Sequence, residues 1–250
     1  MNGLVLGGGG SRGAYQFGAI KALKELGFEY KIVTGTSVGA LNALFLGHNK
    51  YDLLERMWTT IDFDMVINHD YKTKNKPFET FVMSIIKGGL TLEPLELMIK
   101  ENIVIEELKN SDIKSGFVFT KEGRKYTPIK VHDVHSEKEL IDYVIASCSA
   151  YPILKKRVIN GKKCYDGGFS DSLPVKLAKE MGATKIIAID IMKGIRQKVD
   201  TKDIEYLYIK PSRKLGFFLD FTREVIDADI KLGYDDIMNN KEKIIDFINK

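Results

Sequence analysis

The chain has 250 residues, of which 44% are hydrophobic and 29% are charged, and its formal net charge is +4. This composition excludes a disordered chain and a collagen-like repeat, and the mild charge gives no reason to expect a nucleic acid as partner. We expect one domain over residues 1–250, with a motif-bearing core over residues 3–191 and a C-terminal helical tail over about residues 215–250.

The N-terminal stretch and the two cysteines bear on location and redox state. Residues Gly3 to Gly10 are apolar and rich in glycine, but they are too few to span a membrane and lack the charged leader of a secretory signal. We therefore expect a cytoplasmic protein that is at most peripheral at a membrane. Cys148 and Cys164 lie in no CxxC pattern and no Cys/His cluster, so we expect buried, reduced thiols without a disulfide or a zinc site.

The first fifty residues predict alternating strands and helices. A helix that connects two parallel strands has to bury its apolar side on the sheet, so this order predicts a parallel sheet covered by helices. The expected elements are a strand over residues 2–6, a helix over 14–26 that ends at Gly27, a strand over 31–34 and a helix over 38–46 that ends at Gly47.

The rest of the chain predicts a helical middle, two hairpins and a final helix. Residues 51–111 have mainly helical patterns, interrupted by turn-forming segments at 68–77 and 87–94. The remaining expected elements are hairpins over 116–131 and 157–166, helices over 138–146 and 173–181, strands over 185–191 and 204–209, and a C-terminal helix with Phe221, Val225, Ala228 and Leu232 on one face.

A serine lies at the junction of the second strand and the second helix. Gly35, Ser37 and Gly39 form a GxSxG pattern, which is meaningful in a strand–turn–helix context because a sharp turn there exposes the hydroxyl. The helix N-terminus would also offer N–H groups to a developing negative charge. The pattern therefore indicates a nucleophile. The alternative is that Ser37 only caps its helix, a common role for serine.

A second glycine pattern follows the first strand. Gly8, Gly10 and Gly13 form GxGxxG, but the acidic residue that a dinucleotide fold requires after the second strand is absent, and no GK[ST] closes a phosphate loop. A run of residues without side chains lets backbone N–H groups approach an oxyanion. Because the two corners follow neighbouring parallel strands, we expect them to meet in one crevice. The alternative is a purely structural pair of glycine turns.

A serine nucleophile needs a base. The sequence has four histidines, His48, His69, His132 and His135. The first two are expected in solvated surface positions, and the other two lie where a strand ends and a helix starts. Asp166, in the segment YDGGFSDSLP, is the remaining candidate, and partial burial would raise its basicity. The alternative is that Asp166 is a turn residue before Gly167 and Gly168.

Four segments in order, GGGSRGAYQFGAIKAL, GTSVGALNA, ASCSAYP and DGGFSDSLPV, resemble the patatin-like phospholipase family. The resemblance implies a three-layer α/β/α fold with a mainly parallel sheet, and a Ser/Asp dyad without histidine. It implies Ser37 as nucleophile, Asp166 as general base and the backbone of Gly8, Gly9 and Gly10 as oxyanion hole. The residues that support these motifs are Arg12, Gly13, Gly35, Gly39, Gly167 and Gly168. Arg12 would hold the loop or meet a phosphate.

The expected activity is hydrolysis of carboxylic esters of lipids, namely phospholipids, lysophospholipids or acylglycerols, through an acyl-enzyme. No metal and no organic cofactor is needed for this chemistry. Two alternatives stay open at this point. One is acyl transfer to an alcohol or lysolipid by the same dyad, and the other is a non-catalytic lipid-binding module.

One segment of the helical middle could contact a membrane. Three lysines, Lys72, Lys74 and Lys76, precede a run whose Phe78, Phe81, Val82, Ile85 and Ile86 could form one apolar helix face. Such a face can lie on lipid, so residues 78–92 are a candidate lid or docking face. The alternative is that these side chains belong to the core and the lysines to a solvated loop.

Overall fold

Eight strands form one sheet in the computed structural model of the chain, which describes residues 1–68, 77–192 and 199–250. The strands are β1 (Asn2–Leu6), β2 (Ile32–Thr36), β3 (Lys114–Lys121), β4 (Lys125–Lys130), β5 (Arg157–Ile159), β6 (Lys162–Asp166), β7 (Lys185–Ile189) and β8 (Glu205–Ile209). Their order is β5-β6-β3-β2-β1-β7-β8, with β4 also paired to β3. The five strands from β3 to β8 along this order are parallel, and the pairs of β3 with β4 and β6 are antiparallel.

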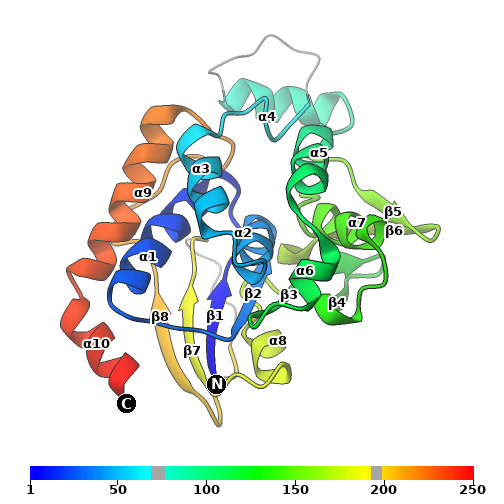
Figure 1. Cartoon of the computed structure of the whole chain (residues 1–250). Coiled ribbons are helices and arrows are strands. Elements are labelled where there is room, and N and C mark those ends of the chain that lie inside the picture. The colour runs from blue at the N-terminus through cyan, green and yellow to red at the C-terminus, as the bar shows by residue number, and fades with distance from the viewer. Residues whose placement is uncertain (69–76, 193–198) are drawn as a thin grey trace.

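Helices cover both faces of this sheet, which confirms the three-layer α/β/α prediction (Figure 1). The helices are α1 (Gly13–Glu25), α2 (Val38–Gly47), α3 (Tyr51–Thr60), α4 (Pro77–Ile86), α5 (Glu93–Asn102), α6 (Ile105–Lys109), α7 (Glu137–Ser147), α8 (Val175–Glu180), α9 (Arg223–Met238) and α10 (Lys241–Asn249). Side chains of β1 alternate between the two layers: Leu4 and Leu6 pack with α1 and α2, whereas Val5 packs with α8.

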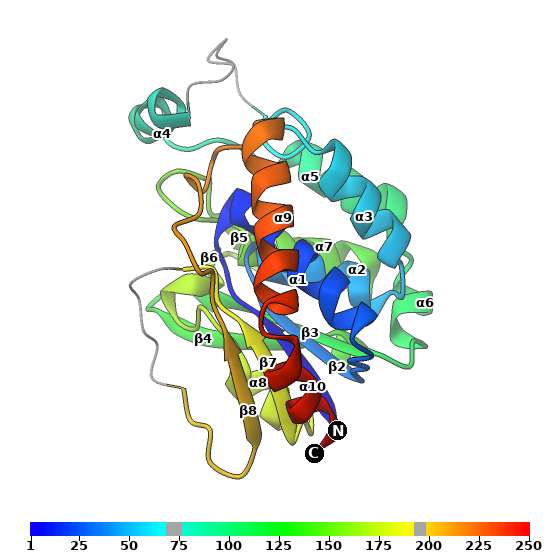
Figure 2. The same cartoon turned by 90° about the vertical axis from the view of Figure 1, so that its left-hand side faces the viewer.

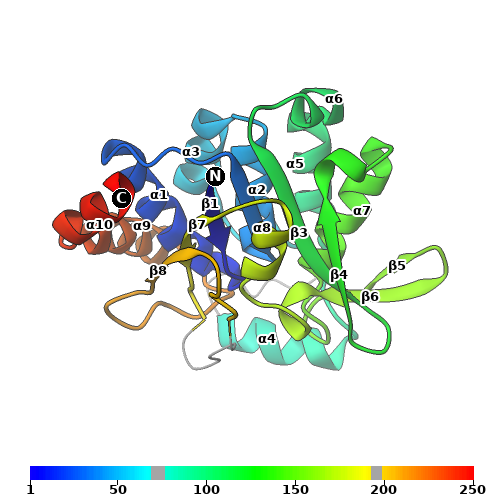
Figure 3. The same cartoon turned by 90° about the horizontal axis from the view of Figure 1, so that it is seen from below.

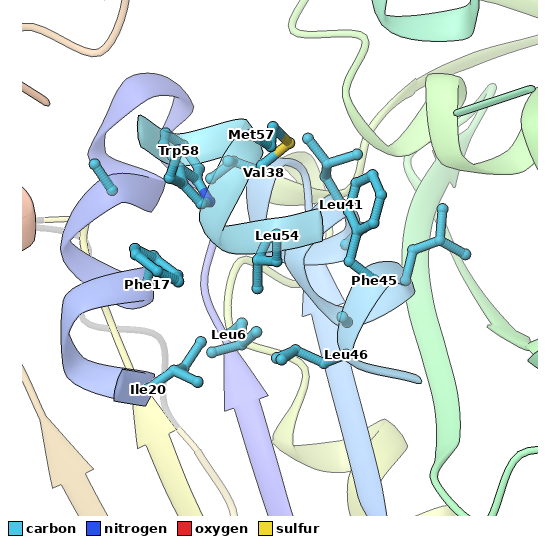
Figure 4. Packing of buried hydrophobic residues seen from close by; sticks show 14 of the residues in the cluster. Leu6, Phe17, Ile20, Val38, Leu41, Phe45, Leu46, Leu54, Met57 and Trp58 are labelled. Carbon is cyan, nitrogen blue, oxygen red and sulfur yellow. The ribbon is translucent and has the colours of Figure 1, made fainter. Parts of the chain in front are cut away.

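The larger core layer lies between the sheet and helices α1, α2 and α3. Every residue of α2 is buried, as its almost wholly apolar sequence VGALNALFLG predicts. Figure 4 shows Leu6 of β1 below Phe17 of α1 and Leu54 of α3, with Trp58 beside Val38 at the start of α2. This packing fixes the N-terminal end of α2 against the carboxyl ends of the strands.

The predicted hairpins are confirmed. β3 and β4 pair in antiparallel fashion around residues 122–124, and β5 and β6 turn at Asn160 and Gly161, both of which have positive φ. The β5–β6 hairpin projects from the edge of the sheet (Figure 3). Its second strand ends at Asp166, so the hairpin carries one predicted site residue to the carboxyl end of β3.

The C-terminal tail differs from its prediction. It forms two helices, α9 and α10, and Phe221 precedes the first of them. Val225 and Ala228 are only partly buried. The helix α9 packs along α1 (Figure 2), and its buried residues are Ile226, Asp229, Leu232, Gly233 and Ile237. At Gly233 an added Cβ would overlap the carbonyl oxygen of Tyr15, so this glycine permits the close approach of the two helices.

Two further predictions concern the cysteines and the polar segment at 68–77. Cys148 and Cys164 are free and buried, as expected. Lys72, Lys74 and Lys76 lie outside the described residues.

Candidate functional site

Ser37 lies at the corner between β2 and α2 with φ 56° and ψ −126°, a conformation that is uncommon for a residue other than glycine. Within the described part of the chain its side chain makes no capping hydrogen bond to α2, so the interpretation of Ser37 as a mere helix cap is wrong. A Cβ added at Gly35 would overlap the carbonyl oxygen of Gly39, and a Cβ added at Gly39 would overlap the carbonyl oxygen of Leu6. The two glycines therefore let the chain fold tightly around an outward-pointing hydroxyl.

A second serine holds this corner in place. The Ser37 amide donates a hydrogen bond to Ser147 Oγ at 3.0 Å, and Ser147 Oγ donates in turn to the Val118 carbonyl at 2.6 Å. Ser147 is fully buried at the end of α7. No role for Ser147 was expected from the sequence, although a hydroxyl next to the apolar run VIA is a signal of a required hydrogen bond.

Asp166 meets Ser37 at this corner. The Ser37 hydroxyl is close enough to the Asp166 carboxylate to lower its pKa, and the Gly168 amide donates to Asp166 Oδ1 at 2.8 Å. Asp166 is 7% exposed. Burial raises its pKa to about 6, although Gly168 and Ser37 act in the opposite direction. Asp166 is therefore also the turn residue that the alternative interpretation expected, and its bond to Gly168 holds the carboxylate beside Ser37.

Two more motif glycines leave room around this pair. An added Cβ at Gly167 would overlap the Val118 carbonyl, and one at Gly13 would overlap Val38 and Trp58 at the start of α2. Larger residues at these positions would push η3 (Gly167–Phe169) or the start of α1 away from the Ser37 corner.

The glycine loop after β1 lies against the same corner. An added Cβ at Gly8 would be 3.2 Å from the Cβ of Ser37, which places the loop beside the serine. The Gly8 amide donates to the Ser172 carbonyl at 3.1 Å, so it is occupied in this arrangement. No backbone hydrogen bond within residues 1–68, 77–192 and 199–250 uses the Gly9 or Gly10 amide. These two N–H groups are the ones in the loop that could donate a hydrogen bond to a ligand.

Contacts with residues 216–218 hold the far side of the loop. The Ser11 amide donates to the Phe218 carbonyl at 2.9 Å, and Arg12 Nε donates to the Gly216 carbonyl at 2.9 Å. Burial lowers the pKa of Arg12 although Asp229 opposes this effect. These contacts are those of a side chain that maintains the shape of the loop, the first of the two roles considered for Arg12.

A buried polar chain that the sequence analysis missed links the first three helices behind the site. Gln16 Nε2 donates to the Gly7 carbonyl at 2.7 Å, Asn42 Nδ2 donates to Gln16 Oε1 at 2.9 Å, and Trp58 Nε1 donates to Asn42 Oδ1 at 2.9 Å. All three side chains are fully buried. A single asparagine in the otherwise apolar α2 was the available signal.

A small cavity opens beside the serine. It measures about 80 Å³ and is lined by Ser37, Gly10 and mainly apolar side chains, among them Leu41, Leu95 and Phe218. A larger cavity of about 560 Å³ lies near the amino ends of the strands and contains neither Ser37 nor Asp166. Of these two cavities, the smaller and more apolar one is therefore the one that Ser37 lines.

The described histidines do not take part in this arrangement. His48 is buried, and its Nε2 accepts a hydrogen bond from the Val104 amide at 3.1 Å, so the solvated position expected for it is wrong. The ring is buried because it satisfies an amide that would otherwise lack a partner after α5. His132 and His135 are exposed, and His69 lies outside the described residues.

The described parts of the chain bear on metal binding and on membrane crossing. No group of three or more His, Cys, Asp or Glu side chains there could hold a metal ion. No helix there is both long and apolar enough to cross a membrane.

Known proteins resemble this chain in sequence. The family model described as "Patatin-like phospholipase" matches residues 4–179. Patatin-like phospholipase domain-containing protein 7 of Rattus norvegicus is 30% identical over 79% of this chain and 14% of its own length. Lysophospholipase NTE1 of Phaeosphaeria nodorum is 30% identical over 76% of this chain and 12% of its own length. The chain thus spans about an eighth of the length of these relatives.

A solved structure has the same fold. VipD from Legionella pneumophila superposes with a TM-score of 0.55 at 14% sequence identity, over 98% of this chain and 66% of that one. The family match covers both glycine corners and the Asp-Gly-Gly turn, which are the segments that build the Ser37 site. By sequence and by fold, the chain is a member of the patatin-like phospholipase family.

Proposed function

We propose that this chain is a serine acyl hydrolase that cleaves carboxylic esters of lipids through a Ser37/Asp166 dyad. The observation that carries the proposal is the position of the Ser37 hydroxyl beside the buried Asp166 carboxylate, whose pKa is raised to about 6. A carboxylate of this basicity can accept a proton near neutral pH, which an ordinary exposed aspartate does poorly.

The geometry leads to a two-step reaction. Ser37 Oγ attacks the ester carbonyl carbon while its proton passes to Asp166, and the carbonyl oxygen becomes an oxyanion beside the Gly9 and Gly10 amides and the N-terminus of α2. The tetrahedral intermediate then expels the alcohol, which takes the proton from Asp166, and an acyl-enzyme remains. Water repeats the sequence with Asp166 as base and releases the carboxylic acid.

The substrate class rests on two supports. The walls of the cavity beside Ser37 are mainly apolar, which suits an acyl chain. The relatives that match are named a patatin-like phospholipase domain-containing protein and a lysophospholipase. We infer an acyl lipid as substrate, and we keep cytoplasmic placement with peripheral membrane contact as predictions from the sequence.

A fluorophosphonate probe tests the proposal directly. The probe should label the protein at Ser37, because only an activated serine reacts with it, and mass spectrometry of the digested protein should place the label on the peptide that contains Ser37. The Ser37→Ala variant is the control and should stay unlabelled. Labelling at another serine, or none, would contradict the proposed nucleophile.

The raised pKa of Asp166 sets the pH dependence. The base acts only when ionised, so kcat/KM for a soluble aryl ester should fall as the pH drops through about 6 and should level off above that value. The measurement is a series of initial rates from about pH 5 to about pH 9. A plateau that extends down to about pH 4, the ordinary value for aspartate, would show that burial does not tune this carboxylate.

A further inference from the structure

Helix α4 has its apolar side outward. Phe78 and Ile86 are 70% and 69% exposed, and Val82 and Ile85 are also exposed. The buried positions of the helix are instead polar, Thr80 and Ser84, at 3% and 0% exposure. A surface helix of a globular protein normally has the opposite orientation, with apolar residues toward the core. An exposed apolar face of this kind indicates an interaction site.

α4 lies near the cavity beside Ser37. In Figures 1 and 2 it is at the end of the molecule toward which the parallel strands point, the end at which Ser37 follows β2. The ring of Phe81 packs edge-on against Phe217 and Phe218, with centroid distances of 6.0 Å and 6.3 Å. Phe218 in turn lines the cavity that contains Ser37. α4 therefore lies directly outside the wall of that cavity.

The cavity is too small for the proposed substrate in this arrangement. Its volume of about 80 Å³ is below the roughly 150 Å³ of an engineered cavity that accepts one benzene, and pockets for drug-sized ligands begin at about 300 Å³. A long acyl chain needs more room than this volume provides. Phe218 is the wall residue that α4 contacts through Phe81, so movement of α4 would enlarge the cavity.

The surroundings of α4 suit a phospholipid surface. Lys87 follows the helix and Lys155 pairs with the segment after it, and both are exposed. Lysines around an apolar helix face favour contact with anionic lipid headgroups. Two more exposed rings, Tyr151 and Phe169, flank Tyr165 in the strand that ends at Asp166.

We infer that the outward face of α4, formed by Phe78, Val82, Ile85 and Ile86, docks on a phospholipid bilayer, and that docking moves α4 and Phe218 to admit the acyl chain. The docking step is independent of the reaction. The second step rests on the proposed hydrolase function.

Vesicle binding tests the docking step without hydrolysis. The Ser37→Ala protein and the same protein with Phe78→Gln and Ile86→Gln are mixed with vesicles of phosphatidylcholine and phosphatidylglycerol and centrifuged. The double substitution should weaken binding roughly ten- to a hundredfold, because two large side chains lose their burial in lipid. The matched control is Ile245→Gln in α10, an exposed isoleucine of a helix at the opposite end of the molecule (Figure 1).

The outcomes separate the two steps. Equal vesicle binding by the parent and the double variant, or an equal loss with Ile245→Gln, overturns the docking face. A change in elution volume on gel filtration without a change in vesicle binding would show that α4 covers a second copy of the chain, and it overturns the inference as well.

With Ser37 intact, the double variant should hydrolyse a short aryl ester at the parental rate and a vesicle phospholipid at least roughly tenfold more slowly. If the parent hydrolyses neither ester, the proposed function fails while the docking result stands.

Discussion

Ser37→Ala is expected to lower kcat/KM for a soluble aryl ester by roughly 10³-fold or more, because it removes the atom that forms the acyl-enzyme. The rest of the corner should persist. Alanine keeps the Cβ that this conformation already accommodates, and the hydrogen bond from the residue 37 amide to Ser147 does not involve the side chain of residue 37. Initial rates for the two purified proteins, with thermal unfolding curves for both, measure the effect.

Ser170→Ala provides the matched control for this substitution. Ser170 lies on the same turn as Asp166, but its hydroxyl bonds Thr120 Oγ1 at 2.8 Å rather than Ser37. We expect Ser170→Ala to retain most of the activity. Equal losses in both variants would mean that disturbance of the turn, and not removal of a nucleophile, explains the effect. An unchanged rate in Ser37→Ala would refute the mechanism.

The sequence predicted the fold where local patterns and tertiary packing agree. The strands and helices of the first fifty residues lie within two residues of their expected bounds, since glycines mark the ends of α1 and α2 and each crossover helix must cover the sheet. The meeting of the glycine loop with the Ser37 corner was also expected, because both follow neighbouring parallel strands. The place of Asp166 beside Ser37 was expected only from the family resemblance, since β6 runs antiparallel to β3.

Tertiary contacts decided what the sequence could not predict. The buried position of His48 depends on the Val104 amide from a distant helix, and the occupied Gly8 amide depends on the Ser172 carbonyl. The orientation of α4 is a further case. Its apolar pattern is equally compatible with burial and exposure, and the burial of Thr80 and Ser84 in the folded chain shows which side of the helix faces inward. Periodicity reports that a face is apolar, not what covers it.

Asp166→Asn should lower kcat/KM by roughly 10²- to 10⁴-fold, the contribution typical of a general base. The amide can still accept the hydrogen bond from Gly168, so the turn should keep its shape while the proton acceptor is lost. The residual rate should also lose the inflection near pH 6 that the parent shows. Initial rates over the pH range, compared between parent and variant, test both expectations.

Stability provides a readout that separates a lost base from a damaged fold. The pKa of Asp166 is raised to about 6 in the folded chain, against roughly 3.9 in an unfolded one, so the fold favours the neutral carboxyl. The cost of ionising it is absent below about pH 4, grows as the pH rises to about 6 and is constant above that value. Asp166→Asn removes this cost and should be more stable than the parent by about 1–3 kcal/mol above pH 6, with no difference near pH 4. An inactive variant that is more stable at neutral pH identifies a carboxylate kept for its chemistry, whereas one that is less stable there would assign Asp166 to the structure of the turn.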